Sequence, residues 1–418
     1  MMEQNTWHET GEKAVLVGVV TGRSGNEYTS EATMAELEEL AKSAGAQVVG
    51  VMTQNRPTPE KSTYLGEGKL EELSQLCQAL EAELVIFDDE LTGTQQRNIE
   101  QAIDIRVIDR SMLILDIFAS RAISREGKLQ VELAQLQYRL PRLMGSGTKL
   151  SRLGAGIGTR GPGESKLESD RRHIRHRIHF LKEELREVAS RRQLHRQRRK
   201  KENRETVVLV GYTNAGKSTI MNYLTNAGIL AENKLFATLD PTARALTLPD
   251  EREVTLIDTV GFIRKLPHHL IEAFHSTLEE AVNADLLLNV VDISDPEYKT
   301  QLDISEQLLS QLGCSEKPQL VVYNQCDKLE HVAENRGNQV YISAKTGMGM
   351  EELLKIMVAF LPSKYRRMHV LLPYEKSGLS AAIRQDGKVI SEEYEEYGIS
   401  IVADIDKRFS YKYEAYQV

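Results

Sequence analysis

The sequence predicts a multidomain α/β protein, and three features carry that prediction. The chain has 418 residues, more than one compact core usually holds. Short β-rich runs alternate with helix-patterned runs, an order typical of parallel sheets covered by helices. Two long helical patterns joined by a glycine-rich segment interrupt this alternation. We predict, in order, a parallel α/β domain (1–122), a long helical hairpin (123–204), a doubly wound α/β domain around a phosphate-binding loop (205–362) and a small α/β domain (363–418).

The N-terminal domain is expected to alternate four strands with four helices. Residues 64–69 (Tyr-Leu-Gly-Glu-Gly-Lys) resemble part of a phosphate-binding loop but lack its Gly-Lys-Ser end. We interpret them as the turn that begins a helix; a contact with a second nucleotide or with RNA is the alternative. The expected strands are 14–20, 48–52, 84–88 and 106–108, and the expected helices are 32–44, 69–82, 93–103 and 111–120.

Apolar residues spaced by threes and fours predict the two helices of the hairpin. Their apolar stripes are narrow, as in helices that pack against a single partner. Glycines are frequent between the two helices, and we place the hairpin tip at 144–166. The stripes are Leu129, Leu133, Leu136, Leu140 and Leu143, then Leu167, Ile174, Ile178, Leu181, Leu185 and Val188; the tip carries Lys149, Arg152, Arg160 and Lys166.

Positive charge is concentrated in residues 171–204, although the whole chain has a formal net charge of −8. A cationic stripe on an acidic protein directs one surface toward polyanions such as RNA. A solvated helix face is the alternative, because Glu183, Glu184 and Glu187 neutralise part of the stripe.

A complete Gly-x4-Gly-Lys-Ser motif lies between a buried-strand pattern (206–210) and a helix pattern (219–224). In that context, backbone N–H groups surround phosphates at a helix N-terminus. Lys217 is expected to reach the β- and γ-phosphates, and Ser218 to bind Mg²⁺. We therefore predict a nucleoside triphosphate site in this phosphate loop, which comprises Gly211, Tyr212, Thr213, Asn214, Ala215, Gly216, Lys217 and Ser218.

Two further segments are expected to respond to the γ-phosphate. An apolar strand ends in an Asp-x-x-Gly segment, whose carboxylate can hold Mg²⁺ through water and whose glycine amide can approach the phosphate. Residues 236–242 are expected to form the first switch, with the Thr238 hydroxyl on Mg²⁺ and Thr242 as the alternative. The nucleotide-contacting residues expected here are Asp258, Thr259, Val260 and Gly261, together with Phe236, Ala237, Thr238, Leu239 and Asp240.

The choice of base is expected to fall to two later segments. A strand leads into Asn-Gln-Cys-Asp, where GTPases have Asn-Lys-x-Asp. The Asp327 carboxylate can accept from guanine N1–H and the 2-amino group, whereas adenine would leave it unpaired. Gln325 replaces the lysine that covers the base, which favours weaker nucleotide affinity. Four motifs in order predict a GTPase that binds guanine through Asn324, Gln325, Cys326, Asp327, Ser343, Ala344 and Lys345, with Lys217, Thr238 and Gly261 catalytic.

Residue 262 is a phenylalanine, where Ras-like enzymes have the glutamine that orients the attacking water. An apolar ring cannot orient water. The sequence therefore leaves two interpretations open: slow intrinsic hydrolysis, or a catalytic element supplied by another loop or partner. Asn214 is compatible with a bound K⁺ that stabilises charge, and equally with a hydrogen bond to the loop backbone.

These motifs resemble those of the HflX family of ribosome-associated GTPases. The resemblance rests on 211–218, 236–240 and 258–262, and most specifically on Gly-Ile-Gly-Thr-Arg-Gly-Pro-Gly-Glu-Ser-Lys-Leu-Glu at 156–168; it runs from about residue 14 to about residue 360. It implies GTP hydrolysis with Mg²⁺, binding to the large ribosomal subunit and its ribosomal RNA, and separation or rescue of ribosomes. It also implies that the tip reaches the ribosomal catalytic centre. Gln325 departs from the family pattern.

Composition constrains the remaining expectations. The chain has three scattered cysteines and no apolar stretch long enough to span a membrane, so we expect a cytoplasmic protein, and a monomer. Residues 363–418 are expected to form strands at 368–372 and 400–405 around a helix at 377–385. An RNA-remodelling NTPase with relaxed base choice, a ribosome assembly GTPase and a scaffold stabilised by nucleotide remain as alternatives.

Overall fold

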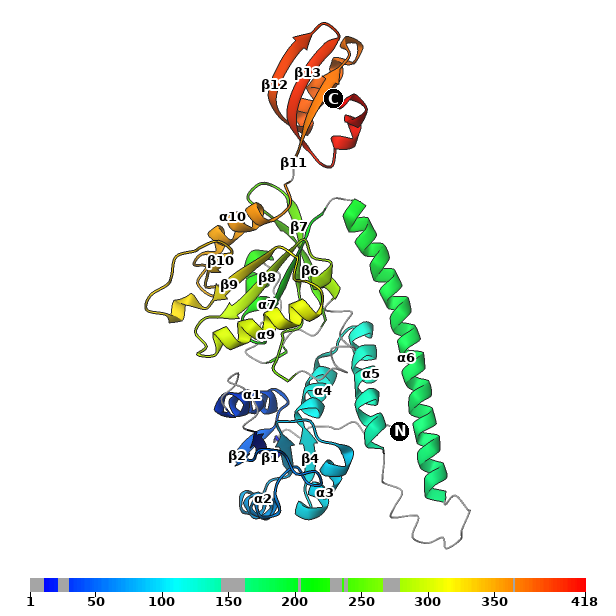
Figure 1. Ribbon diagram of the computed structural model, residues 1–418, viewed down its shortest axis with the longest axis vertical. Coiled ribbons are helices and arrows are strands. Elements are labelled where there is room, and N and C mark those ends of the chain that lie inside the picture. The colour runs from blue at the N-terminus through cyan, green and yellow to red at the C-terminus, as the bar shows by residue number, and fades with distance from the viewer. Residues whose placement is uncertain are drawn as a thin grey trace.

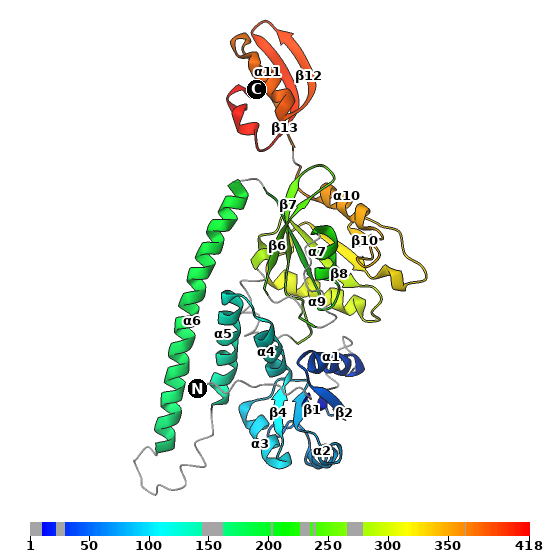
Figure 2. The same cartoon turned by 180° about the vertical axis from the view of Figure 1, so that it is seen from behind.

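The computed structural model describes residues 11–21, 30–143, 162–201, 204–225, 235–236, 240–265, 279–363 and 365–418. These residues form three separate sheets and a pair of long helices, arranged along one axis of the molecule (Figures 1 and 2). The fold is the mixed α/β class that the sequence predicts. Within these residues, no helix is long and apolar enough to cross a membrane.

The first sheet has four parallel strands in the order β2-β1-β3-β4. Neighbouring residues of each strand point to opposite faces. Helices α1 and α4 therefore cover one face, where Leu16 and Ile86 are buried, and α2 and α3 cover the other, where Val17 and Phe87 are buried. The elements are β1 (Lys13–Val20), α1 (Ser30–Ser43), β2 (Gln47–Asn55), α2 (Glu67–Leu80), β3 (Leu84–Phe87), α3 (Gly93–Ile103), β4 (Arg106–Asp109) and α4 (Arg110–Arg121).

The hairpin consists of α5 (Arg125–Arg142) and α6 (Pro162–Lys201), which lie side by side in both views (Figures 1 and 2). Leu129, Leu133 and Leu181 of the predicted stripes are buried against each other. Ion pairs flank this seam: Arg177 lies 2.7 Å from Glu132, and Arg125 lies 2.8 Å from Glu184. We call the first sheet, its helices and α5 the N-terminal unit.

The second sheet has six strands in the order β10-β9-β8-β5-β7-β6, and only the edge pair β6–β7 is antiparallel. Helices α7 and α10 pack on one face. Helix α9 packs on the other face, in the same apolar cluster as α1 and α4 of the N-terminal unit. The elements are β5 (Thr206–Gly211), α7 (Lys217–Thr225), β6 (Thr242–Thr247), β7 (Glu253–Asp258), β8 (Leu286–Asp292), α9 (Tyr298–Gln311), β9 (Gln319–Asn324), η3 (Cys326–Lys328), β10 (Gln339–Tyr341) and α10 (Met350–Phe360).

The third sheet is antiparallel, in the order β11-β13-β12, and sequence analysis missed one of its strands. The missed strand, β12 (Gly387–Glu395), is mostly exposed on both faces, so it lacks the apolar alternation that marks a half-buried strand. The other elements are β11 (Tyr365–Leu372), η4 (Tyr374–Lys376), α11 (Gly378–Asp386), β13 (Gly398–Asp406), η5 (Ser410–Lys412) and η6 (Glu414–Tyr416).

Candidate functional site

The phosphate loop connects the end of β5 to the start of α7. Gly211 and Gly216 have φ angles of +133° and +91°, which side chains rarely tolerate. A Cβ at Gly211 would also lie 2.2 Å from the Val290 carbonyl oxygen, and one at Gly216 would lie 2.2 Å from Asn324 Nδ2. Both glycines are therefore required by the backbone conformation and by close neighbours.

The Lys217 side chain is buried beneath the phosphate loop. Its Nζ donates to the carbonyl oxygens of Gly211 at 3.0 Å and Tyr212 at 2.6 Å. Burial lowers the pKa of Lys217 to about 8, although nearby Asp258 opposes that shift. The loop thus holds a cation at the N-terminus of α7, an arrangement suited to binding phosphate.

The segment from Asp258, the last residue of β7, to Phe262 meets the loop through three of its residues. Ser218 Oγ donates to Asp258 Oδ2 at 2.7 Å. A Cβ at Gly261 would lie 2.7 Å from Thr213 Cα and 2.9 Å from Lys217 Nζ, so only glycine fits there. Phe262 adds two backbone hydrogen bonds, from its N–H to Gly211 O at 3.0 Å and from the Thr213 N–H to its carbonyl oxygen at 2.8 Å.

The hydroxyl of Ser218 and the carboxylate of Asp258 are hard oxygen donors, which suit Mg²⁺. Mg²⁺ keeps several waters and binds one or two protein oxygens together with phosphate. The described residues contain no group of three or more His, Cys, Asp or Glu that could hold a metal. The donor set therefore fits a magnesium ion bound jointly with phosphate.

The predicted guanine segments lie beside the phosphate loop. Asn324 Nδ2 donates to Ala215 O at 2.9 Å, and its Oδ1 accepts from the Ala344 N–H at 3.0 Å, so one side chain joins both segments to the loop. Ser343 Oγ donates to Asp327 Oδ1 at 2.6 Å and lowers the pKa of that exposed carboxyl. Cys326 is buried, Lys345 is exposed, and Gln325 Nε2 donates to Asp292 Oδ2 at 2.6 Å.

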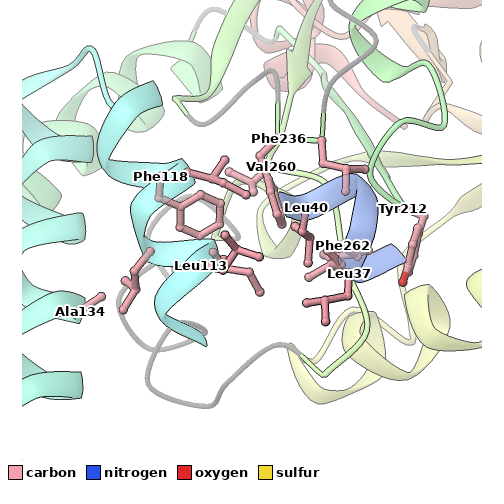
Figure 3. Close-up of a cluster of buried hydrophobic side chains, with 14 of the residues drawn as sticks. Leu37, Leu40, Leu113, Phe118, Ala134, Tyr212, Phe236, Val260 and Phe262 are labelled. Atoms are coloured by element: carbon pink, nitrogen blue, oxygen red, sulfur yellow. The ribbon is translucent and has the colours of Figure 1, made fainter. Parts of the chain in front are cut away.

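Several predicted residues have side chains directed away from the loop. Thr259 Oγ1 donates to Leu209 O at 2.7 Å inside the sheet, and Val260 is buried in the apolar cluster. Phe236 is also buried in that cluster, where its ring meets Phe118 of α4 (Figure 3). Ala237, Thr238 and Leu239 of the first switch lie outside the described residues, whereas Asp240 is described and contacts the start of α5.

Sequence reasoning missed the contacts between this site and the N-terminal unit. The Tyr212 hydroxyl donates to Glu36 of α1 and accepts from the Arg264 N–H at 2.8 Å. Glu36 also pairs with Arg110 of α4, whose guanidinium is 2% exposed. Arg110 lies 2.7 Å from Asp88, which in turn pairs with Lys265. Burial lowers the pKa of Arg110 to about 10. These partners are distant in sequence and belong to no motif.

Comparison with known proteins adds the family. Three family models match the chain: "GTP-binding GTPase N-terminal" over residues 31–119, "GTP-binding GTPase Middle Region" over 121–199 and "50S ribosome-binding GTPase" over 206–325. A crystal structure of a GTP-binding protein from Sulfolobus solfataricus in complex with GDP is similar with a TM-score of 0.44 and 25% identity, covering 84% of this chain and 98% of that chain.

Curated relatives match over almost the whole chain. The GTPase HflX of Caldanaerobacter subterraneus is 52% identical over 394 residues, which cover 94% of this chain and 91% of that protein. The GTPase HflX of Escherichia coli is 41% identical over 401 residues, which cover 94% of this chain and 92% of that protein. The chain is therefore a GTPase that belongs to the HflX family.

Proposed function

We propose that this GTPase binds the large ribosomal subunit through ribosomal RNA and separates or rescues ribosomes in a GTP-dependent cycle. The observation that carries the GTP-dependent part of the proposal is the Asn324 side chain, which ties the phosphate loop to both predicted guanine segments. The description "50S ribosome-binding GTPase" of the family model over residues 206–325 supports the choice of partner.

In the proposed reaction, the buried charge of Lys217 stabilises the phosphates, while Ser218 and Thr238 would bind Mg²⁺ and Asp258 would hold it through water. The ion would supply neutralisation of the phosphate charge. The Gly261 amide approaches the γ-phosphate from the Asp-x-x-Gly segment. Asp327, held by Ser343, selects guanine.

Phe262 does not orient the attacking water in this proposal. Its ring is 2% exposed and packs in the apolar cluster with Tyr212 and Leu37 (Figure 3). Asn214 is exposed in the phosphate loop with a φ angle of +62°. We propose that Asn214 helps to hold a K⁺ that stabilises the developing charge, so that turnover is faster in K⁺ than in Na⁺.

Contact with RNA is assigned to α6 and the glycine-rich tip. Arg172 and Arg175 are exposed on α6, whereas Arg177 is paired with Glu132 across the seam. Contacts from such side chains to phosphates give affinity that does not depend on RNA sequence and weakens with salt. Residues 144–161 of the predicted tip, including Lys149, Arg152 and Arg160, lie outside the described residues, whereas residues 162–166 belong to α6.

Sedimentation with ribosomes and isolated large subunits tests the proposal. We expect binding with GTP or a non-hydrolysable analogue and little binding with GDP. Replacing Arg172 and Arg175 with glutamate should weaken binding and reduce its salt dependence, while the basal rate of GTP hydrolysis stays unchanged. Replacing the seam residue Glu132 with glutamine is the matched control. Equal sedimentation in all three nucleotides would contradict a GTP-dependent cycle.

A further inference from the structure

Both described ends of the first switch contact the N-terminal unit. Just before the first switch, the Leu235 N–H donates to Ser43 Oγ of α1 at 3.2 Å. Next to it, the Phe236 ring meets Phe118 of α4 edge to face, with 4.7 Å between ring centroids (Figure 3). At the other end, Asp240 contacts the start of α5. The described residues on both sides of 237–239 therefore contact the same neighbour, the N-terminal unit.

The Asp240 carboxylate lies on the first turn of α5. Its Oδ2 accepts from the backbone N–H groups of Ile123 at 3.1 Å and Ser124 at 2.7 Å, and Ser124 Oγ donates to its Oδ1. Ser124 is also the N-cap of α5, because its Oγ accepts from the Gly127 N–H at 2.9 Å. A single hydroxyl thus serves the helix and the switch at the same time.

The surroundings favour a carboxylate at this position. Helix α5 has 18 residues, and its N-terminus carries partial positive charge and N–H groups that need acceptors. Gly127 provides room, since a Cβ there would lie 2.4 Å from Asp240 Oδ1. The acidic side chain in the same turn, Glu126, is engaged elsewhere: it pairs with Arg192 at 2.8 Å and accepts from Gln130 at 3.1 Å.

A fixed Asp240 limits the distance at which Thr238 of the first switch can lie from it. Thr238 precedes Asp240 by two residues, and two residues of extended chain span at most about 7 Å. On the other side, β6 begins at Thr242, which is paired in register with Asp258 of β7. In sequence, Asp240 therefore lies between Thr242, the first residue of β6, and Thr238, the residue that we propose binds Mg²⁺.

We propose that Ser124 is a positioning residue for GTP hydrolysis, which acts through Asp240 on the first switch without touching the nucleotide. By holding Asp240, it fixes the chain two residues after Thr238, the proposed metal ligand, and so supports turnover. This inference rests on the proposed metal-binding role of Thr238. That role has its own test, because Thr238→Ala should abolish hydrolysis whatever Ser124 does.

Two substitutions at Ser124 separate positioning from helix capping. Asparagine and aspartate are both good N-caps, but only the asparagine amide can donate to Asp240, whereas an aspartate repels it. In single-turnover assays without ribosomes, Ser124→Asn should stay close to the parent rate. Ser124→Asp should be slower by about tenfold, with GDP affinity and thermal midpoint matching those of Ser124→Asn. Equal rates in the two variants, or a faster Ser124→Asp, would overturn the proposal.

A double-mutant cycle shows whether the effect passes through Asp240. Asp240→Asn removes the negative charge that Ser124→Asp would repel, so in this background Ser124→Asp should slow hydrolysis by less than about twofold. A persistent tenfold effect would mean that Ser124 acts by another route, and the proposal would fail. If Ser124→Asp does not fold, Gly127→Ala replaces it, because its methyl group must displace the Asp240 carboxylate; an unchanged rate in that variant would equally reject the proposal.

Discussion

The GTPase domain has two neighbours, and it is joined to them in different ways. The N-terminal unit contacts the phosphate loop through Tyr212, the segment after Gly261 through Arg264 and Lys265, and the first switch through Asp240. The third sheet follows α10 at the opposite end of the domain (Figure 1). Conformational changes in the phosphate loop, the segment after Gly261 or the first switch should therefore be transmitted to the N-terminal unit and not to the third sheet.

The chemistry of the two connections differs as well. On the N-terminal side, buried charged residues such as Arg110 and Asp88 surround an apolar cluster that continues from one domain into the next. On the C-terminal side, Arg252 Nη1 donates to Pro362 O at 2.7 Å and Nη2 donates to Val358 O at 3.2 Å, which holds the end of α10 and the linker. Arg252 is buried as well, but it acts through hydrogen bonds, whereas the first connection adds the apolar cluster that both domains share.

The largest effect is expected from Asp88→Ala. This change leaves the guanidinium of Arg110, 2% exposed, without the carboxylate that lies 2.7 Å from it, and it also removes one of the two carboxylates that pair with Lys265. Loss of one member of a buried ion pair costs about 3–5 kcal/mol in the free energy of unfolding, which urea titration measures. The control is Asp404→Ala in the third sheet, whose exposed pair with Arg367 should contribute little. Similar losses in both variants would remove the distinction between the two regions.

Smaller effects on the free energy of unfolding are expected from the buried carboxyl of Asp116 and the carboxyl of Asp404 in the third sheet. These effects should change with pH in opposite directions. Burial raises the pKa of Asp116 in α4 to about 6, opposed by Arg106 and helped by Glu12. The stabilisation linked to its proton is complete below about pH 4, the unfolded pKa, and is lost as pH rises through 6. Asp116→Asn should therefore add about 2–3 kcal/mol at pH 8 and almost nothing near pH 4.

In the third sheet, the hydrogen bond from Arg367 lowers the pKa of Asp404, so the stabilisation from Asp404 is present above about pH 4 and is lost as pH falls. Urea unfolding of Asp116→Asn and Asp404→Asn at both pH values would measure these opposite trends. If Asp116→Asn increased the free energy of unfolding equally at both pH values, the pKa of the Asp116 carboxyl would not be raised by burial.

Arg252→Ala should loosen the third sheet at a cost of about 2 kcal/mol, because two carbonyl oxygens lose a charged donor. Spin labels at Lys355 on α10 and Tyr397 beyond β12 should then show a broader distance distribution. Arg244→Ala is the control, since that exposed arginine donates only to the neighbouring Ala243 O, at 3.2 Å, among the hydrogen bonds described for it. An unchanged distance distribution in Arg252→Ala would mean that the linker holds the third sheet in place without Arg252.

The smallest effect is expected from ending the chain at Ser363, which removes the third sheet. The basal rate of GTP hydrolysis should stay within about twofold of the parent, because none of the nucleotide segments described above lies in that sheet (a tenfold change would correspond to about 1.4 kcal/mol). Single-turnover hydrolysis measures it. A strong fall in rate would show that the C-terminal connection also reaches the nucleotide site.

Sequence was sufficient for features whose information is local. The phosphate loop is eight consecutive residues, and the hairpin repeats apolar residues every three or four positions. Glu36, Asp88 and Ser124 are ordinary polar residues in sequence, and their importance comes from partners 116 to 177 positions away. Tyr212 combines local and distant information. The motif predicts that its backbone belongs to the phosphate loop, but not that its hydroxyl contacts Glu36 of α1.

The length of α6 has a mechanical consequence. A straight helix of 40 residues is about 60 Å long, whereas the 18 residues of α5 cover only about 27 Å of it. The end of α6 at Lys201 lies beside the GTPase domain, and its start at Pro162 lies far from it (Figure 1). Such a helix is a lever arm: a tilt of about 5° at the GTPase end displaces the other end by about 5 Å, close to the rise of one helical turn. A small change of angle at the GTPase end of α6 thus becomes a displacement of several ångströms at its other end.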